Sequence, residues 1–234
     1  MLFIPKILDY IHEKYHLKKI EKYIKNNLNV DIDVVFDVGC YKGSFIDIIQ
    51  NIYKANCKIY AFEAETKIFD KLNRYKDHKN INIYNFGISD KDGSLELNVS
   101  HQEGTSTFSS VNHNSKYLNF KSKVLREEVF SKKQRIEVQK IDSFCEKNNI
   151  KKIDLLKIDT EGHEMSVLSG AEKSIKNIKI ILLEVSNHDM YLNYDNKKID
   201  DFLINNNFKF IKYFRTPFQK WEDRIYVNKK FFKF

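Results

Sequence analysis

The chain has 234 residues, and 42% of them are hydrophobic, which is enough to bury one sizeable core. Seven Gly and two Pro exclude a collagen-like or low-complexity protein, and no apolar run approaches the roughly 20 residues that a membrane-spanning helix needs. Three widely spaced cysteines make neither a disulfide framework nor a paired zinc motif. We therefore expect a reduced, cytoplasmic protein with no integral membrane contact.

The charge balance favours the cations, with 40 Lys and Arg residues against 32 Asp and Glu and a net charge of +8. A basic chain raises nucleic acid as a partner. Only five of these cations are Arg, however, and Arg is the residue preferred for bidentate contacts to phosphates and bases. We interpret the scattered lysines as a solvated surface and expect no nucleic-acid partner.

The segment 1–30 predicts one amphipathic helix or two short ones. Its apolar side chains recur at spacings of three to five residues, at Ile7, Leu8, Ile11, Tyr15, Ile20, Tyr23 and Ile24. A lysine at position 6 and the lack of a small-residue cleavage site argue against a secretory signal. We expect this extension to pack on the domain behind it. Peripheral membrane association and a dimer contact are the alternatives, so the oligomeric state stays open, with a homodimer as one option.

Residues 31–234 alternate short β-branched runs with helix-like segments, which is typical of a parallel sheet with crossover helices. The predicted strands are 34–38, 58–63, 81–86, 153–158, 179–185, 208–214 and 224–228, and the predicted helices are 44–53, 66–75, 142–148, 164–176 and 199–206. Between them, period-two alternation over 94–99, a Ser- and Thr-rich stretch at 104–111 and a strand at 135–139 indicate an inserted β-hairpin and loop. The fold class is thus α/β, with a Rossmann-like doubly wound, mostly parallel seven-stranded sheet in one domain.

A glycine-containing turn follows the first predicted strand, in the sequence Asp37-Val-Gly39-Cys40-Tyr41-Lys-Gly43. Glycines between a strand and a helix let the backbone approach a ligand. A carboxylate directly before the turn suits a cationic or hydroxyl-bearing ligand better than a pyrophosphate, which it would repel. The spacing also lacks the middle glycine of the dinucleotide fingerprint.

A second signal is Glu63, which ends the next strand 20 residues after Gly43. An acid at this spacing accepts hydrogen bonds from the hydroxyls of a ribose. The two signals together predict a cofactor that contains a nucleoside. Asp37 and the missing glycine favour S-adenosylmethionine over NAD, and an NAD-dependent oxidoreductase is the alternative.

Two further groups of ionisable residues follow apolar strands. The first holds Asp159, Glu161 and His163, at the edge where open α/β sheets carry out acid–base chemistry. Acids that complement a helix dipole explain part of this group, and we rank a metal site below acid–base chemistry because no second close His or Cys accompanies it. The second group, with Glu184 and His188, could face the same cleft and contact a substrate.

These motifs resemble those of the FkbM-family methyltransferases, a branch of the class I enzymes that use S-adenosylmethionine. FDVGCYKGSF resembles the glycine turn of the family, YAFEA its second strand end, and LLKIDTEGHEMSVLSGAEKSI its most distinctive segment. ILLEV also fits the family pattern. The resemblance implies a class I methyltransferase domain over 31–234 behind the helical extension of 1–30.

The resemblance also implies roles for individual residues. The methionine part of the cofactor would lie against Asp37, Gly39, Cys40, Tyr41 and Gly43, its ribose against Glu63 and Ala64, and its adenine against Asn85, Gly87 and Ile88. Cys40-Tyr41 replaces the usual Ala-Asn pair, and Ala64 replaces the Pro of the family. The transferred methyl group and the acceptor would lie near Asp159, Glu161 and His163.

The resulting prediction is O-methylation of a hydroxyl on a sugar, a glycan or a secondary metabolite. His163 is the first choice for the base because the pKa of an imidazole lies nearest neutral pH. An RNA methyltransferase and a non-catalytic binding protein with the same fold stay open as competing hypotheses.

Overall fold

The computed structural model describes residues 3–28, 30–215 and 220–233, with side chains from residue 15 onward. A seven-stranded sheet forms its centre, in the order β3-β2-β1-β7-β8-β10-β9. Only the pairs made by β10, with β8 and β9, are antiparallel; the other four pairs are parallel. The predicted doubly wound, mostly parallel sheet is confirmed.

The strands of this sheet agree with the apolar runs of the sequence. They are β1 (Val34–Val38), β2 (Lys58–Phe62), β3 (Ile81–Tyr84), β7 (Ile153–Ile158), β8 (Ile178–Ser186), β9 (Phe208–Phe214) and β10 (Trp221–Asn228). The helices around it are α1 (Phe3–Asn27), α2 (Ser44–Tyr53), α3 (Thr66–Phe69), α5 (Ile141–Lys147), α6 (Glu164–Ser169) and α7 (Asn196–Asn205). Short 3₁₀ turns follow three of them, at Lys54–Asn56, Asp70–Tyr75 and Ile175–Asn177.

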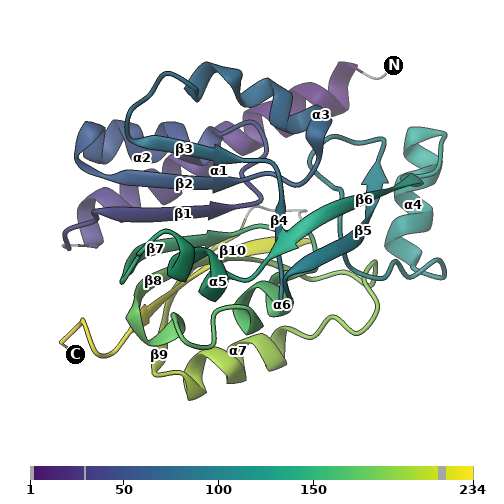
Figure 1. Cartoon of the computed structure of the whole chain (residues 1–234). Coiled ribbons are helices and arrows are strands. Elements are labelled where there is room, and N and C mark those ends of the chain that lie inside the picture. The colour runs from purple at the N-terminus through teal and green to yellow at the C-terminus, as the bar shows by residue number, and fades with distance from the viewer. Residues whose placement is uncertain (1–2, 29, 216–219, 234) are drawn as a thin grey trace.

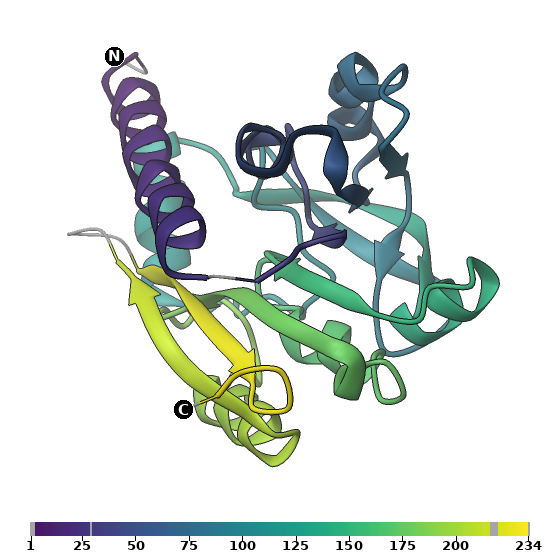
Figure 2. The same ribbon diagram turned by 90° about the vertical axis from the view of Figure 1, so that its left-hand side faces the viewer.

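Helices cover both faces of the sheet, because alternate side chains of each buried strand point to opposite faces. In Figure 1, α5, α6 and α7 lie in front of the sheet, and Figure 2 shows α1 on the opposite side. One core, in front, contains Phe36, Leu156 and Leu183. The other, behind, contains Val35, Leu155 and Leu182.

The predicted insertion forms a second, three-stranded sheet in the order β4-β6-β5, built from β4 (Gly87–Ile88), β5 (Gly93–Ser100) and β6 (Phe130–Gln139). Strands β5 and β6 are antiparallel, as a hairpin requires. The segment between them contains α4 (Lys116–Leu125), which was not predicted from the sequence. Figure 1 shows α4, and the end of the hairpin that it connects, on the side toward which the parallel strands point.

Residues 3–27 form one helix, α1, rather than two. Ile20 and Ile24 are buried in the core behind the sheet, as predicted, whereas Tyr15 is 60% exposed. The predicted contacts of Ile7, Leu8 and Ile11 lie outside the described side chains. Within the described residues, no helix combines the length and the apolar character that crossing a membrane requires.

Candidate functional site

The glycine turn after β1 forms as predicted, at the carboxyl end of the strand. Gly39 and Gly43 adopt positive φ angles of 78° and 84°, which glycine tolerates best. A Cβ atom on Gly39 would lie 1.8 Å from the carbonyl oxygen of Asp159. The turn is fixed by the backbone N–H groups of Gly39 and Cys40, which both donate to the carbonyl oxygen of Phe62 at 3.0 Å.

Glu63 lies beside this turn, and the turn itself positions its carboxylate. The backbone N–H of Tyr41 donates to Oε2 at 2.9 Å, and the backbone N–H of Glu65 donates to Oε1 at 2.8 Å. Each carboxylate oxygen can accept a second hydrogen bond. Burial raises the pKa of Glu63 to about 7, although the two N–H groups act in the opposite direction. The arrangement presents one fixed acceptor group to a ligand that carries neighbouring hydroxyls.

The other residues predicted to hold a cofactor fall into two groups. Asn85 and Ala64 belong to the Glu63 turn, because the Asn85 amide donates to the carbonyl oxygens of Glu63 at 2.9 Å and Ala64 at 3.3 Å. Cys40, Gly87 and Ile88 are buried, the first and last in the two cores. Their side chains present almost no surface to a ligand, so a cofactor would meet these residues through their backbone, and their roles stay predictions.

A buried Lys links two of the predicted acids. Lys157 Nζ donates to Asp159 Oδ2 at 2.9 Å and lies 3.8 Å from Asp37 Oδ1. Asp37 is fully buried, and neither of its carboxylate oxygens has a hydrogen-bond partner among the described residues. Burial raises the pKa of Asp37 to about 6, against the opposing effect of Lys157. Lys157 was not predicted as a site residue, although a lone cation inside an apolar strand was a usable signal.

Glu161, in the loop after β7, and Glu164, the first residue of α6, have different roles. Glu161 has a positive φ of 53° and accepts a hydrogen bond from the Tyr191 hydroxyl at 2.5 Å, and burial raises its pKa to about 7. Glu164 accepts from the backbone N–H groups of Thr160 at 3.1 Å and Gly162 at 3.0 Å. Glu164 therefore shapes the loop, whereas Glu161 borders the site.

His163 lies in a different environment from the acids around Lys157. Its Nε2 is 2.9 Å from the Ser89 hydroxyl, and its ring packs against Phe108 with centroids 5.4 Å apart. Burial lowers its pKa to about 4, and the charges that act on it are Asp90 and Lys91. This placement does not agree with His163 as the base, because the ring faces the small sheet instead of Lys157 and its neighbours.

Glu184 and His188, which were predicted to face one cleft, also lie in different surroundings. His188 stacks on Tyr117 of α4, with centroids 4.6 Å apart and an interplanar angle of 8°, and burial lowers its pKa to about 4. Its neighbour Asp189 caps α4 by accepting from the Ser115 hydroxyl at 2.6 Å. Glu184 instead points to the face of the sheet behind β8, and burial raises its pKa well above the ordinary value.

The loop of residues 101–107, inside the insertion, folds over the glycine turn. Glu103 pairs with Lys42 of the turn at 2.6 Å and also with Lys71 after α3. The Ser106 hydroxyl donates to Glu65 Oε2 at 2.7 Å, next to the Glu63 turn. A hollow of about 420 Å³ opens between this loop, α3 and the β5–β6 hairpin. The insertion thus forms one wall of the candidate site.

A buried pair between distant segments completes the site. His16 of α1 lies with Nε2 2.6 Å from Asp223 Oδ2 of β10, and both residues are buried. Asp223 is the register partner of Glu184 in β8. Neither His16 nor Asp223 was predicted, because 207 residues separate them and no local pattern connects them. In the described ranges, no group of three or more His, Cys, Asp or Glu is placed to hold a metal ion.

The carboxyl ends of β1, β2, β7 and β8 therefore carry a glycine turn, an acid held by two backbone N–H groups and a cluster of carboxylates around one Lys. The Methyltransferase FkbM domain model matches residues 37–210, and the chain belongs to that family of methyltransferases. The predicted family is confirmed, and it sets aside the alternative of an NAD-dependent oxidoreductase.

Individual relatives are distant. The hexuronic acid methyltransferase AglP of Haloferax volcanii is 24% identical over 155 residues, which are 65% of this chain and 56% of AglP. A methyltransferase FkbM from Methylobacillus flagellatus KT superposes with a TM-score of 0.56 at 16% identity, over 88% of this chain and 46% of that one. The chain thus spans about half the length of both proteins.

Magnesium protoporphyrin IX methyltransferase of Synechocystis PCC 6803, solved with S-adenosylmethionine, superposes at a TM-score of 0.53 and 11% identity, over 97% of this chain and 85% of that one. These superpositions confirm the predicted class I methyltransferase fold. The predicted cofactor agrees with the ligand bound to the Synechocystis protein.

Proposed function

We propose that this chain transfers the methyl group of S-adenosylmethionine to an oxygen atom of a sugar or glycan. The observation that carries the proposal is the Glu63 carboxylate, held by two backbone N–H groups beside a glycine turn into which no Cβ atom would fit. Such a group suits the ribose hydroxyls of an unphosphorylated nucleoside. Membership of the FkbM methyltransferase family supports methyl transfer, and the AglP relative supports a sugar acceptor.

The cofactor would be held by Glu63 at its ribose and by the glycine turn of Gly39–Gly43 at its methionine part. When bound, it supplies a methyl group on a positively charged sulfur. Asp37 contributes to this site by charge rather than by contact, because its side chain is fully buried behind Lys157. The remaining carboxylates at this edge favour a cationic centre. The chain's main contribution to rate is positioning, since displacement at a methyl carbon needs a collinear acceptor.

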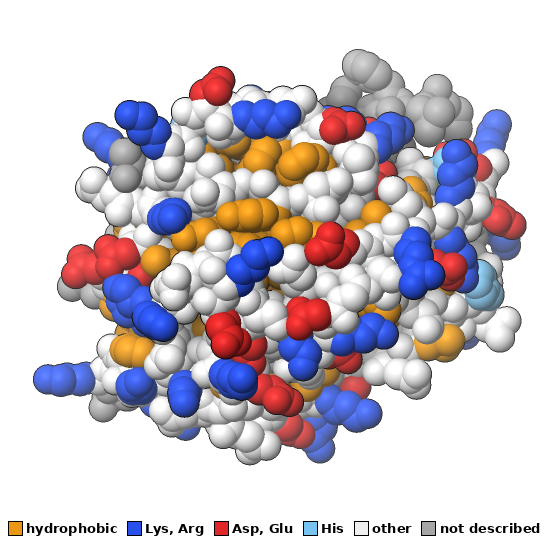
Figure 3. All heavy atoms as spheres, viewed as in Figure 1, with side chains coloured by type: hydrophobic (Ala, Val, Ile, Leu, Met, Phe, Trp, Pro, Cys, Tyr) orange, Lys and Arg blue, Asp and Glu red, His pale blue; other side chains and the backbone are white. Residues whose placement is uncertain are grey.

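The +8 charge raised an RNA acceptor as an alternative. On the face seen in Figure 3, Lys and Arg are interspersed with Asp and Glu instead of forming a broad basic patch. A nucleic-acid interface of useful affinity concentrates its cations on one face or stripe. This face therefore gives no support to an RNA acceptor, and the proposal keeps a small or glycan acceptor.

The first experiment is calorimetric titration with S-adenosylmethionine, S-adenosylhomocysteine and NAD in parallel. We expect micromolar binding of the two sulfur nucleosides and no binding of NAD. Glu63→Gln should lose at least tenfold in affinity, because its amide N–H₂ would face a backbone N–H. Glu172→Gln, at an exposed acid on the turn after α6, is the matched control. Binding of NAD alone would refute the proposal.

The second experiment identifies the acceptor class. Transfer of a radiolabelled methyl group is measured to three pools: neutral oligosaccharides, oligosaccharides that contain hexuronic acids, and total tRNA. We expect label in one of the saccharide pools. Label in tRNA alone would overturn the sugar assignment, and cofactor binding without transfer to any pool would favour a non-catalytic binding protein.

A further inference from the structure

The carboxylates at this edge of the sheet differ in whether another group already donates a hydrogen bond to them. Asp159 accepts from Lys157, Glu161 from Tyr191, and Asp223 is paired with His16. Asp37 is fully buried. Glu184 is the exception: it is partly exposed, and no described side chain or backbone group donates a hydrogen bond to its carboxylate.

The position of Glu184 follows from the strand register. Ile158 of β7 pairs with Leu183 of β8, so Glu184 lies beside Asp159. Asp159 in turn adjoins the glycine turn, because its N–H donates to the carbonyl oxygen of Val38 at 2.9 Å. Neighbouring strands are about 4.8 Å apart, which places Glu184 roughly 10 Å across the sheet from Gly39. A cofactor whose methionine part lies on the turn would therefore direct its methyl group toward this side.

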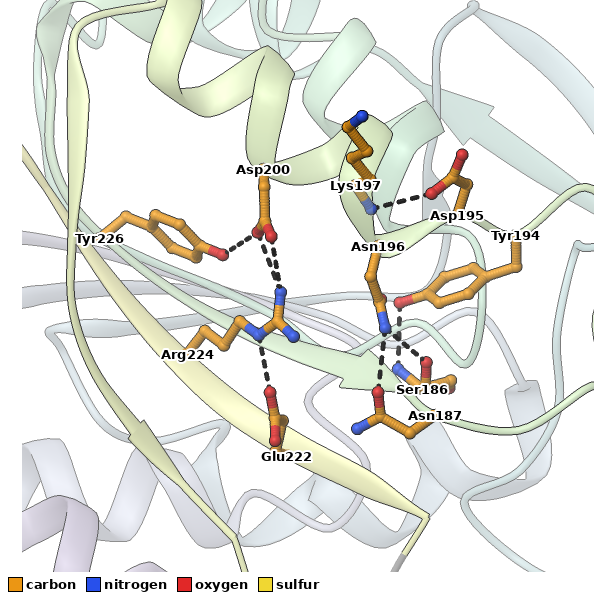
Figure 4. A network of polar contacts seen from close by, with 10 residues as sticks. All are labelled: Ser186, Asn187, Tyr194, Asp195, Asn196, Lys197, Asp200, Glu222, Arg224 and Tyr226. Carbon is orange, nitrogen blue, oxygen red and sulfur yellow. Dashed lines mark hydrogen bonds and ion pairs between the residues drawn. The ribbon is translucent and has the colours of Figure 1, made fainter.

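The backbone that carries Glu184 is fixed from the opposite face. Figure 4 shows that the Asn196 amide donates to the Ser186 carbonyl oxygen at 3.0 Å and to Asn187 Oδ1 at 3.1 Å, and that the Ser186 N–H donates to the Tyr194 hydroxyl at 3.1 Å. On the neighbouring strand, Arg224 bridges Glu222 at 2.8 Å and Asp200 of α7 at 2.9 Å. These contacts hold the end of β8 in place without using Glu184.

The titratable groups facing Glu184 come from three strands and the loops that follow them. They are Lys157, Asp159, Glu161, Asp223 and the neutral tyrosines Tyr191 and Tyr194. Burial and the three nearby acids raise the pKa of Glu184, and Lys157 lowers it. A carboxylate with a raised pKa is a stronger base, and the partly exposed Glu184 accepts no hydrogen bond from the described residues.

We propose that Glu184, rather than His163, is the catalytic base that takes the proton from the acceptor hydroxyl. The inference rests on the proposed function. The acceptor oxygen forms a bond to the methyl carbon while the bond between that carbon and sulfur breaks, and the electron pair of the broken bond stays on sulfur. The hydroxyl proton moves to the Glu184 carboxylate and is then released to solvent. His16 and Asp223 are positioning residues, because they secure the strand beside Glu184.

The test compares the affinities of S-adenosylmethionine and S-adenosylhomocysteine by calorimetry from pH 6 to pH 9. The sulfur of S-adenosylmethionine carries a positive charge, and that of S-adenosylhomocysteine does not. A nearby ionised carboxylate therefore favours S-adenosylmethionine. We expect the affinity ratio to rise about tenfold with pH in the unmodified protein, as the carboxylates at this edge, Glu184 among them, ionise. In Glu184→Gln the rise should be clearly smaller than in the unmodified protein but not absent, because Asp37, Glu63 and Glu161 still ionise in this range. Binding of S-adenosylhomocysteine should stay within about twofold of the unmodified protein. Glu172→Gln should behave like the unmodified protein.

Because Glu161 also titrates near neutral pH, Glu161→Gln is measured in parallel. If Glu161→Gln removes the pH dependence and Glu184→Gln keeps it, the proposal is overturned. A ratio that is flat in the unmodified protein also overturns it, while binding of S-adenosylhomocysteine leaves the proposed function standing. Failure of the unmodified protein to bind either nucleoside overturns both.

Turnover gives a second readout with whichever saccharide pool accepts the methyl group. Glu184→Gln should lower kcat by about 100-fold or more with little change in the acceptor KM, which is the usual contribution of a general base. Glu184→Asp should recover part of this loss, with a displaced pH profile. A kcat that falls in His163→Gln and is unchanged in Glu184→Gln would return the role to His163.

Discussion

Asp37 offers a sharp test of the electrostatics of the site. Burial raises its pKa from 3.8 to about 6 in the folded protein. The unfolded chain therefore loses the proton at a lower pH than the folded one does. Between pH 4 and pH 6 the folded state loses stability as pH rises, and above about pH 7 the whole penalty is present. We expect Asp37→Asn, which removes the charge, to stabilise the protein at alkaline pH.

The magnitude follows from the displacement of the pKa. About two pKa units correspond to roughly 3 kcal/mol when the side chain is fully buried. The Asn amide would be buried without hydrogen-bond partners, but both oxygens of Asp37 already lack such partners among the described residues. The costs of burying unpaired polar atoms therefore largely cancel between the two proteins. For a chain of this size each kcal/mol shifts Tm by about 2–4 °C. We expect Tm to rise by about 6–12 °C at pH 8 and hardly at all at pH 4.

The assay is thermal unfolding of the ligand-free protein at pH 4, 6 and 8, with Glu172→Gln, at an exposed acid, as the control. The gain in Tm should grow with pH and should be absent from the control. Asp37→Asn should at the same time weaken S-adenosylmethionine more than S-adenosylhomocysteine, because one negative charge leaves the site. A Tm at pH 8 below that of the unmodified protein would show that Asp37 is held by its pair with Lys157, and the reasoning would be wrong.

Three other substitutions test separate parts of the site. In Gly39→Ala the new Cβ atom would lie 1.8 Å from the carbonyl oxygen of Asp159. We expect Tm to fall by at least about 6 °C and S-adenosylhomocysteine binding to be abolished, and near-normal binding would contradict this. His16→Ala leaves Asp223 buried without its partner, so we expect a loss of about 3–5 kcal/mol in urea unfolding and faster hydrogen exchange in α1; unchanged exchange would count against it. Glu103→Ala removes the exposed ion pairs with Lys42 and Lys71. Stopped-flow fluorescence should show faster release of S-adenosylhomocysteine, while the free energy of unfolding changes by less than about 1 kcal/mol. A larger loss of stability would refute a purely local role.

The central strands could be predicted closely because their sequences are determined by burial on both faces. Strands β1, β7 and β9 begin and end at the predicted residues, and so does α2. Helix α4 could not be predicted from local sequence, since its cap includes Asp189, more than 70 residues away. Its exposed Phe120 and Val124 also weaken the amphipathic pattern. The predicted helix 164–176 ends early, at Ser169, where Gly170 packs against the Ser89 backbone.

The same distinction between local and tertiary information applies to the site. The position of Glu63 beside the glycine turn could be predicted, because one helix and one strand, α2 and β2, separate the two in the sequence. The direction in which the His163 ring points could not be predicted, because positive φ angles at Glu161 and Gly162 turn the chain between Asp159 and His163. Asp159, Glu161 and His163 are close in sequence, but the turn at Glu161 and Gly162 directs His163 away from the two acids.

Helix α1 shows why the predicted boundary at residue 30 does not separate two independent units. Ile20, Ile24 and Leu28 are buried in the core behind the sheet, and burying three such side chains contributes at least about 5 kcal/mol. That contribution is comparable to the net stability of a whole domain, about 5–15 kcal/mol. His16 from the same helix is paired with Asp223, the strand neighbour of Glu184. We infer that the extension and the sheet fold as one unit, because α1 supplies both core surface and a partner to the carboxylates of the site.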